Sequence, residues 1–226
     1  MIPHNNPTSI VTLHATHGKT MAKGFTFIGG RWSEHEKPPK AYKYLFRFKE
    51  LSGIGSWLTY APTIPECAVA IFGGVSEIPQ TAVRRQLVEN GGVIKAVPRH
   101  LTAFDIDGMS IPEMPDWSRH SLVEASKYVR SQLGPIFENV TCVAQMTAKM
   151  GVTTSLKEFR GRLWFWCDKP IDQMQVKAVI KELNLPNRVL DPSILFPANV
   201  IYTAPPKLLN DLGGPHDDPK IGRAHV

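Results

Sequence analysis

Two aspartates stand two residues apart in the segment LTAFDIDGM, at the end of an apolar run and directly before a glycine. Side chains at positions i and i+2 of a strand point to the same side, so Asp105 and Asp107 would project together. Phe104 and Ile106 would then face the opposite layer. Two carboxylates this close repel each other unless they share a proton, meet a cation or bind a divalent metal. The alternative is a solvated strand end that runs into a turn.

A third acid, Asp191, follows two apolar residues and precedes a proline in the segment NRVLDPSIL. If this segment pairs with the strand that carries Asp105 and Asp107, the three carboxylates meet across neighbouring strands. Three oxygen donors without histidine or cysteine partners suit Mg²⁺ or Mn²⁺ better than zinc. Alternatively, Asp191 only caps the turn around Pro192.

A basic segment, QMTAKMGVTTSLKEFRGRLWFW, separates these acids in the sequence. Thr147 and Lys149 leave one expected strand. Arg160 and Arg162 enter the next, and antiparallel pairing of the two strands would gather all four side chains at one loop. Arginine offers a bidentate fork and lysine a point charge, so together they can bind a triphosphate. The alternative is a solvated basic hairpin.

Aromatic side chains follow this basic segment. Trp164 and Trp166 alternate with Phe165, so one face of the strand is buried and the other could reach the site. Trp164 or Trp166 could then stack on a nucleobase, although core packing explains most of such a run. Near the amino terminus, His14 and His17 stand three residues apart without a partner spacing, and we expect them at the surface.

The elements around these residues predict an α+β fold in the order β-α-β-β-α-β. This is the order of ferredoxin-like and RNA-recognition-motif-like domains, and it makes residues 99–204 the half of the protein that carries the acids. The first and third strands lie at the centre of such a sheet. The expected strands are 101–106, 140–146, 163–167 and then 189–190 or 200–203, with helices that begin near Asp116 or Ser118 and near Pro170 or Asp172.

The rest of the chain is predicted in two parts. Residues 1–98 form a smaller N-terminal α/β unit with strands at 9–13, 44–48 and 67–72 and a helix at 80–90. Residues 205–226 are rich in Pro, Gly and Asp, and we expect a crossing segment or a linker that leads to further domains.

Composition favours a protein with an anionic partner. The chain has 226 residues, of which 42% are hydrophobic, and a formal net charge of +6. This charge favours a polyanion such as nucleic acid. The absence of a long apolar run or a signal pattern predicts a soluble, cytoplasmic protein. Cys67, Cys142 and Cys167 have no paired spacing, so neither a disulfide framework nor a zinc ribbon is predicted.

Taken in order, these motifs resemble the archaeo-eukaryotic primase (AEP) superfamily, in particular the primase-polymerase (PrimPol) domains of phage and plasmid replication proteins. The FDID segment matches the family's first motif, and Asp191 in RVLDPSIL matches its third. The segment IYTAPP that follows also resembles those phage proteins. The second motif is usually a small hydroxyl residue followed by histidine. Thr147 fits the hydroxyl, whereas Arg162 stands at the strand entry where a histidine is expected.

This resemblance implies a DNA primase or DNA polymerase that performs metal-dependent, template-directed nucleotidyl transfer during replication of a phage, plasmid or other mobile element. The three aspartates would hold two Mg²⁺ or Mn²⁺ ions, and the basic loop would bind the phosphates of a nucleoside triphosphate. The implied partners are a single-stranded DNA template, a primer, and a helicase domain or protein in cis or in trans. The implied location is the cytoplasm of a bacterial or archaeal host.

Two other functions fit parts of the sequence. A HAD-type phosphatase uses an Asp-x-Asp-Gly motif, in which Asp105 would be the nucleophile and Asp107 the acid/base. Such enzymes place the motif near the start of a doubly wound domain with Thr after the Gly, whereas here Met109 follows and 104 residues precede. A non-catalytic module that binds single-stranded or origin DNA would keep the sheet and use no metal.

Overall fold

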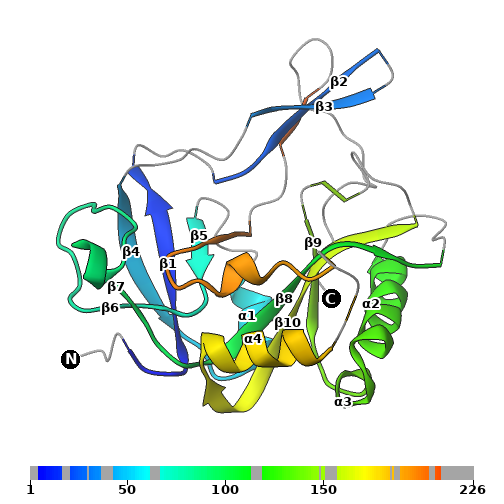
Figure 1. Ribbon diagram of the computed structural model, residues 1–226. Helices are drawn as coiled ribbons and strands as arrows, with labels where there is room; N and C mark the ends of the chain where they lie inside the picture. Colours follow the sequence, from blue (N-terminus) through cyan, green and yellow to red (C-terminus); the bar gives the residue numbers. More distant parts are fainter. Residues whose placement is uncertain are drawn as a thin grey trace.

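The segment from residue 99 onward forms an antiparallel sheet in the order β8-β10-β9, shown in the computed structural model of Figure 1. Its strands are β8 (Arg99–Ser110), β9 (Val143–Met146) and β10 (Glu158–Ile171), and its helices are α2 (Arg119–Leu133), α3 (Pro135–Glu138) and α4 (Gln173–Glu182). The structure describes residues 5–16, 21–29, 31–36, 43–61, 67–112, 119–147, 149–150, 157–183, 185, 189–203 and 207–209.

A single bridge completes this sheet on the outer edge of β8. Leu190 pairs antiparallel with Ile106, and both side chains are buried in the core. The order along the chain is therefore β8, α2, β9, β10, α4 and then Leu190. This is the predicted β-α-β-β-α-β order with its last strand reduced to one bridge, and β8 lies between Leu190 and β10.

The two long helices form where the sequence predicted them. The apolar face of α2, made of Leu122, Ala125, Val129 and Leu133, is buried. Asp172 caps α4 and accepts hydrogen bonds from the backbone of Met174 at 2.8 Å and Gln175 at 2.9 Å. The Gln175 side chain accepts the Asp172 N–H in return, which completes a capping box.

The N-terminal part builds a second sheet in the order β11-β5-β1-β4. Figure 1 shows it beside the first sheet, with the hairpin of β2 and β3 projecting from the pair. The elements of this part are β1 (Ser9–Ala15), β2 (Gly24–Ile28), β3 (Arg31–Glu36), β4 (Tyr44–Glu50), α1 (Ile54–Tyr60), β5 (Cys67–Ala70), β6 (Gly73–Val75), β7 (Ile94–Ala96), β11 (Ile201–Tyr202) and β12 (Lys207–Leu209).

One of the two hydrophobic core clusters contains residues of both sheets. Trp57 of α1 packs against Trp164 of β10 with ring centroids 4.5 Å apart, and both are fully buried. Arg99, the first residue of β8, is also fully buried and donates hydrogen bonds to the backbone of Asn6, to Ser9 Oγ at 3.0 Å and to the Gly73 carbonyl at 2.7 Å. Burial lowers the Arg99 pKa to about 10, so the group is still charged at neutral pH.

The α+β class with antiparallel sheets is confirmed, and two details of the prediction are wrong. Residues 80–90 form no α-helix, because Val83 bridges Tyr44 at the edge of β4 and only Val88–Asn90 makes a 3₁₀ turn. Residues 200–203 do not pair with β8. Ile201 and Tyr202 pair with β5 instead, so the chain crosses back to the N-terminal sheet, where Ile201 is buried.

Replacing Asp172 with Ala should lower the free energy of unfolding by about 1 kcal/mol, because two backbone N–H groups at the start of α4 lose their acceptor. The measurement is the midpoint of denaturant unfolding, monitored by circular dichroism. The exposed Glu77→Ala is the control and should stay close to the wild type. Equal midpoints for Asp172→Ala and Glu77→Ala would contradict the capping role.

Candidate active site

The face of β8 opposite Ile106 carries the acids. The antiparallel register sets Asp105 of β8 against Arg162 of β10, and Asp107 against Arg160. On the other edge, the bridge between Ile106 and Leu190 sets Asp191 beside Asp105. Two backbone hydrogen bonds hold this edge, from Asp191 N to the Asp105 carbonyl at 2.9 Å and from Asp107 N to the Val189 carbonyl at 2.8 Å. Directly opposed residues share a sheet face, so all three aspartates lie on one face.

Each carboxylate of β8 forms an ion pair with an arginine of β10. Arg162 Nε lies 2.9 Å from Asp105 Oδ1, and both side chains are largely buried, at 12% and 16% exposure. Arg160 forms a hydrogen-bonded ion pair with Asp107, which is more open to solvent at 59% exposure. Glycine is required next to this pair, because Gly108 has φ of +95° and a Cβ there would stand 3.2 Å from Arg160 Nη2.

Burial and neighbouring charges act on the pKa of Asp105. Burial raises this pKa above its ordinary value of 3.8, and the ion pair with Arg162 counteracts the rise. The negative charges of Asp191 and Asp107 raise it further. Asp105 therefore interacts electrostatically with both other acids, as convergent carboxylates must.

Asp191 combines the two roles that the sequence left open. Its Oδ1 accepts the Ser193 N–H at 2.8 Å and its Oδ2 accepts the Ser193 hydroxyl at 2.8 Å, so it caps the 3₁₀ turn Pro192–Leu195. The same residue lies beside Asp105. Ser193 therefore fixes the orientation of this carboxylate, a positioning role that its sequence context did not reveal.

The basic residues join Asp105 and Asp107, but not Asp191, around one pocket of about 220 Å³. Thr147 donates from its hydroxyl to the Arg160 carbonyl at 3.1 Å, which ties the end of β9 to the start of β10. The pocket is lined by Asp105, Asp107, Thr147, Lys149, Arg160 and Arg162, which the sequence predicted, and also by Lys23, Gln145, Met146 and Tyr202.

The residues that the sequence analysis did not assign to the site come from distant parts of the chain. Tyr202 of β11 accepts a hydrogen bond from Arg162 Nη1 at its carbonyl, at 2.8 Å. Glu34 of β3 lies between two lysines of the pocket, 3.9 Å from Lys23 Nζ and 3.8 Å from Lys149 Nζ. No local pattern distinguishes these residues, because Tyr202 depends on the pairing of β11 with β5 and Glu34 lies on the distant β2–β3 hairpin.

The two tryptophans are not part of this pocket. Trp164 is fully buried against Trp57 and donates its Nε1–H to Gln145 at 3.2 Å, so base stacking on Trp164 is excluded and core packing is its role. Trp166 stacks on His100 with centroids 5.2 Å apart and lines a different pocket. His14 is buried beside Thr12 and not at the surface, and His17 lies outside the described residues.

The donor chemistry of the acids fits a hard divalent cation. In the described part of the chain, no three His, Cys, Asp or Glu side chains are already arranged as a metal-binding group. Among the same residues, however, Asp105 Oδ1 is buried and its contact is the ion pair with Arg162 Nε, 2.9 Å away. A buried carboxylate oxygen with unused acceptor capacity is a suitable ligand for Mg²⁺ or Mn²⁺.

Comparison with known proteins adds no family assignment, because no family model, no curated protein and no solved structure matches the chain. Functional inference therefore depends on the residues of the site. Across the described residues, no helix has the length and apolar character needed to cross a membrane.

The stability of the wild type relative to Asp105→Asn should fall as the pH rises above the ordinary carboxyl pKa of 3.8. The raised pKa means that the folded state binds this proton more tightly than the unfolded state, so deprotonation costs stability. Urea unfolding of both proteins in metal-free buffer between pH 4 and neutrality measures the difference. The exposed Glu77→Gln is the charge-matched control. A relative gain in wild-type stability with pH would mean that the Arg162 pair outweighs burial.

Proposed function

We propose that this chain is a nucleotidyltransferase, a DNA primase or DNA polymerase of the primase-polymerase (PrimPol) type in the AEP superfamily, acting in replication of a phage, plasmid or other mobile element. The observation that carries this proposal is the row Asp191, Asp105, Arg162 across three adjacent segments of one sheet face. Such a row sets oxygen ligands for metal directly beside cationic ligands for phosphate.

The order of elements supports the same proposal. The resemblance implies an RNA-recognition-motif-like half with the first acids on its central first strand and the third acid on its fourth. β8 lies between β10 and Leu190, and Asp191 follows Leu190 directly. Within the α+β class, we propose the AEP primase-like fold, in which a smaller N-terminal α/β unit packs on this half.

In the proposed reaction, Asp105, Asp107 and Asp191 would hold the metal ions. Bound Mg²⁺ or Mn²⁺ would supply activation of a 3′-hydroxyl and neutralisation of the triphosphate. Arg160 and Arg162 balance the charge of their aspartates, and guanidinium groups bind phosphate with the same fork that binds carboxylate. The two arginines could therefore also bind the triphosphate once metal neutralises the aspartates, with Thr147 and Lys149 beside them.

We propose that Arg162 takes the role of the histidine that is usual in the family these motifs resemble. A histidine changes its charge near neutral pH, whereas an arginine stays cationic. The Tyr202 carbonyl holds one end of this guanidinium, so its fork is oriented before phosphate arrives.

The template and primer would be bound by the positive surface of the chain, whose formal net charge is +6. A helicase in cis or in trans and a location in the host cytoplasm belong to the same proposal.

The phosphatase alternative has no support from the fold, because β8, β9 and β10 pair antiparallel and not in a doubly wound parallel sheet. The non-catalytic DNA-binding module remains the rival.

Purified protein should synthesise or extend primers on single-stranded DNA with Mg²⁺ or Mn²⁺. Asp105→Asn/Asp107→Asn should lose more than roughly 100-fold of this activity, since loss of even an outer-shell partner of a metal costs 10–100-fold. Gel analysis of labelled products measures it, with Glu77→Gln as a fully active control. A folded wild type that is inactive with all nucleotides and both metals would refute the proposal.

Titration with Mn²⁺ should raise the melting temperature of the wild type, because a ligand that binds only the folded state stabilises it, by about 2.7 kcal/mol at 100 times its dissociation constant. Differential scanning fluorimetry measures the shift. Asp105→Asn/Asp107→Asn should show little of it, while Glu77→Gln should match the wild type. A wild-type melting temperature that does not change when Mn²⁺ is added would favour the non-catalytic DNA-binding module.

A further inference from the structure

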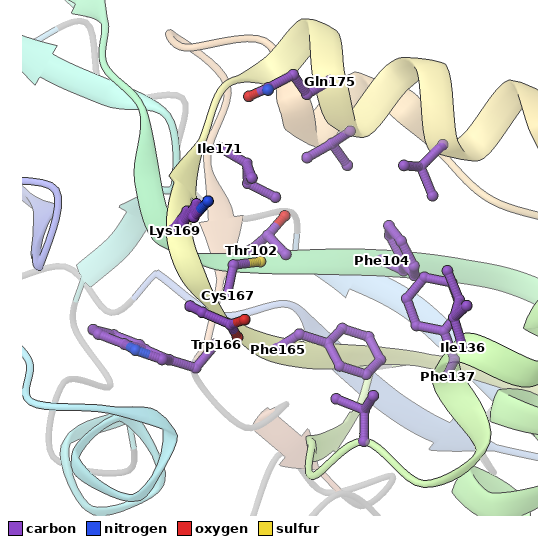
Figure 2. Close-up of a pocket in the computed structure, with 14 residues that line it drawn as sticks. Thr102, Phe104, Ile136, Phe137, Phe165, Trp166, Cys167, Lys169, Ile171 and Gln175 are labelled. Carbon is purple, nitrogen blue, oxygen red and sulfur yellow. The ribbon is translucent and has the colours of Figure 1, made fainter.

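A second and larger cavity lies on the other face of the sheet from the acids. Its volume is about 540 Å³, within the range of small-molecule sites. The floor is made by β8 and β10, where the register sets Phe165 opposite Thr102 and Leu163 opposite Phe104. Figure 2 shows α4 along one side of this cavity and the segment with Ile136 and Phe137 along another.

Aromatic rings form one corner of the cavity. The ring centroids of Phe104, Phe137 and Phe165 are 5.3 to 5.6 Å apart in each pair, with tilted or edge-on planes. Phe104 and Phe165 are buried in the core. Their positions are therefore fixed by packing, and the corner offers a preformed surface for a flat apolar ring.

One polar group points into this apolar space. Thr102 is only 3% exposed, yet in the described part of the chain its Oγ1 has no hydrogen-bond partner. Figure 2 shows its side chain on the strand floor, facing the space below α4. A buried hydroxyl without a partner destabilises the folded state, so the site gains free energy from a ligand that supplies a hydrogen bond.

The mouth of the cavity is apolar and open. Ile136 of α3 is 70% exposed and Val140 is 37% exposed, although both line the cavity. Lys169 and Gln175 lie on the polar part of its lining. A small molecule that entered here would cover Ile136 and reach the aromatic corner and Thr102 together.

We propose that this cavity binds a small aromatic compound that carries one hydroxyl group, a phenol in the simplest case. The ring packs in the corner of Phe104, Phe137 and Phe165, and its hydroxyl bonds to Thr102 Oγ1, which can both donate and accept. This site is separate from the acidic pocket and does not depend on the proposed function. Phe104 and Asp105 are adjacent on β8, so the ligand would contact the strand that carries the acids.

The test compares 4-fluorophenol with 4-fluorotoluene, two compounds of nearly equal shape that differ in the hydroxyl group. Binding to the full chain is measured by ¹⁹F NMR titration at millimolar concentrations. The wild type should bind 4-fluorophenol roughly 2- to 10-fold more tightly, the usual net effect of one hydrogen bond. Thr102→Val should abolish this preference and Thr102→Ser should keep it. Thr59→Val, on α1, is the matched control and should behave as the wild type.

A variant that fills the cavity locates the site independently of Thr102. Val179→Phe adds a ring from α4 and should abolish binding of both compounds, while circular dichroism checks that the variant is folded. Absence of 4-fluorophenol binding to the wild type would overturn the proposal. So would binding that survives Val179→Phe, or a preference for the phenol that survives Thr102→Val.

Discussion

The pairing of β8 along both of its edges is the constraint on which the rest of the structure depends. β10 occupies one edge over most of its length, and Leu190 occupies the other at a single bridge. The strand's two-residue period then separates its side chains, with Ile106 turned to the core and Asp105 to the site. A slip of one residue in either pairing would exchange these faces. The fold and the candidate site are thus specified by the same register.

The sequence predicts this site as far as local patterns reach. Asp105 and Asp107 alternate with apolar residues, and Asp172 begins α4 with a capping box, so both signals depend on neighbours within a few positions. Residues 80–90 form no α-helix, because Val83 bridges Tyr44 of β4 and Leu87 bridges Ile94 of β7, and tertiary partners override a weak local preference. Tyr202 belongs to the site only because β11 pairs with β5, which no short window of sequence reveals.

The ion pairs of the site are better explained by function than by stability. Burial raises the pKa of Asp105 more than its pair with Arg162 lowers it, and replacing a buried ion pair with apolar residues of similar volume is often neutral or stabilising. The pair therefore adds little stability to the core, but it suits a site in which the charged groups bind metal and phosphate. Arg160 and Asp107, nearer to solvent, can separate at lower cost.

The hydrogen bonds of the buried Arg99 guanidinium also indicate how much of the chain must be synthesised before the core is complete. It satisfies the backbone of Asn6, the hydroxyl of Ser9 and the carbonyl of Gly73, all of which are synthesised before it. The sheet β11-β5-β1-β4 needs β11 as well, which is made about a hundred residues later. A nascent chain that ends before residue 99 therefore has an incomplete core, and a growing chain must wait for most of its length before either sheet closes. The two sheets should accordingly be gained and lost together, as one cooperative unit.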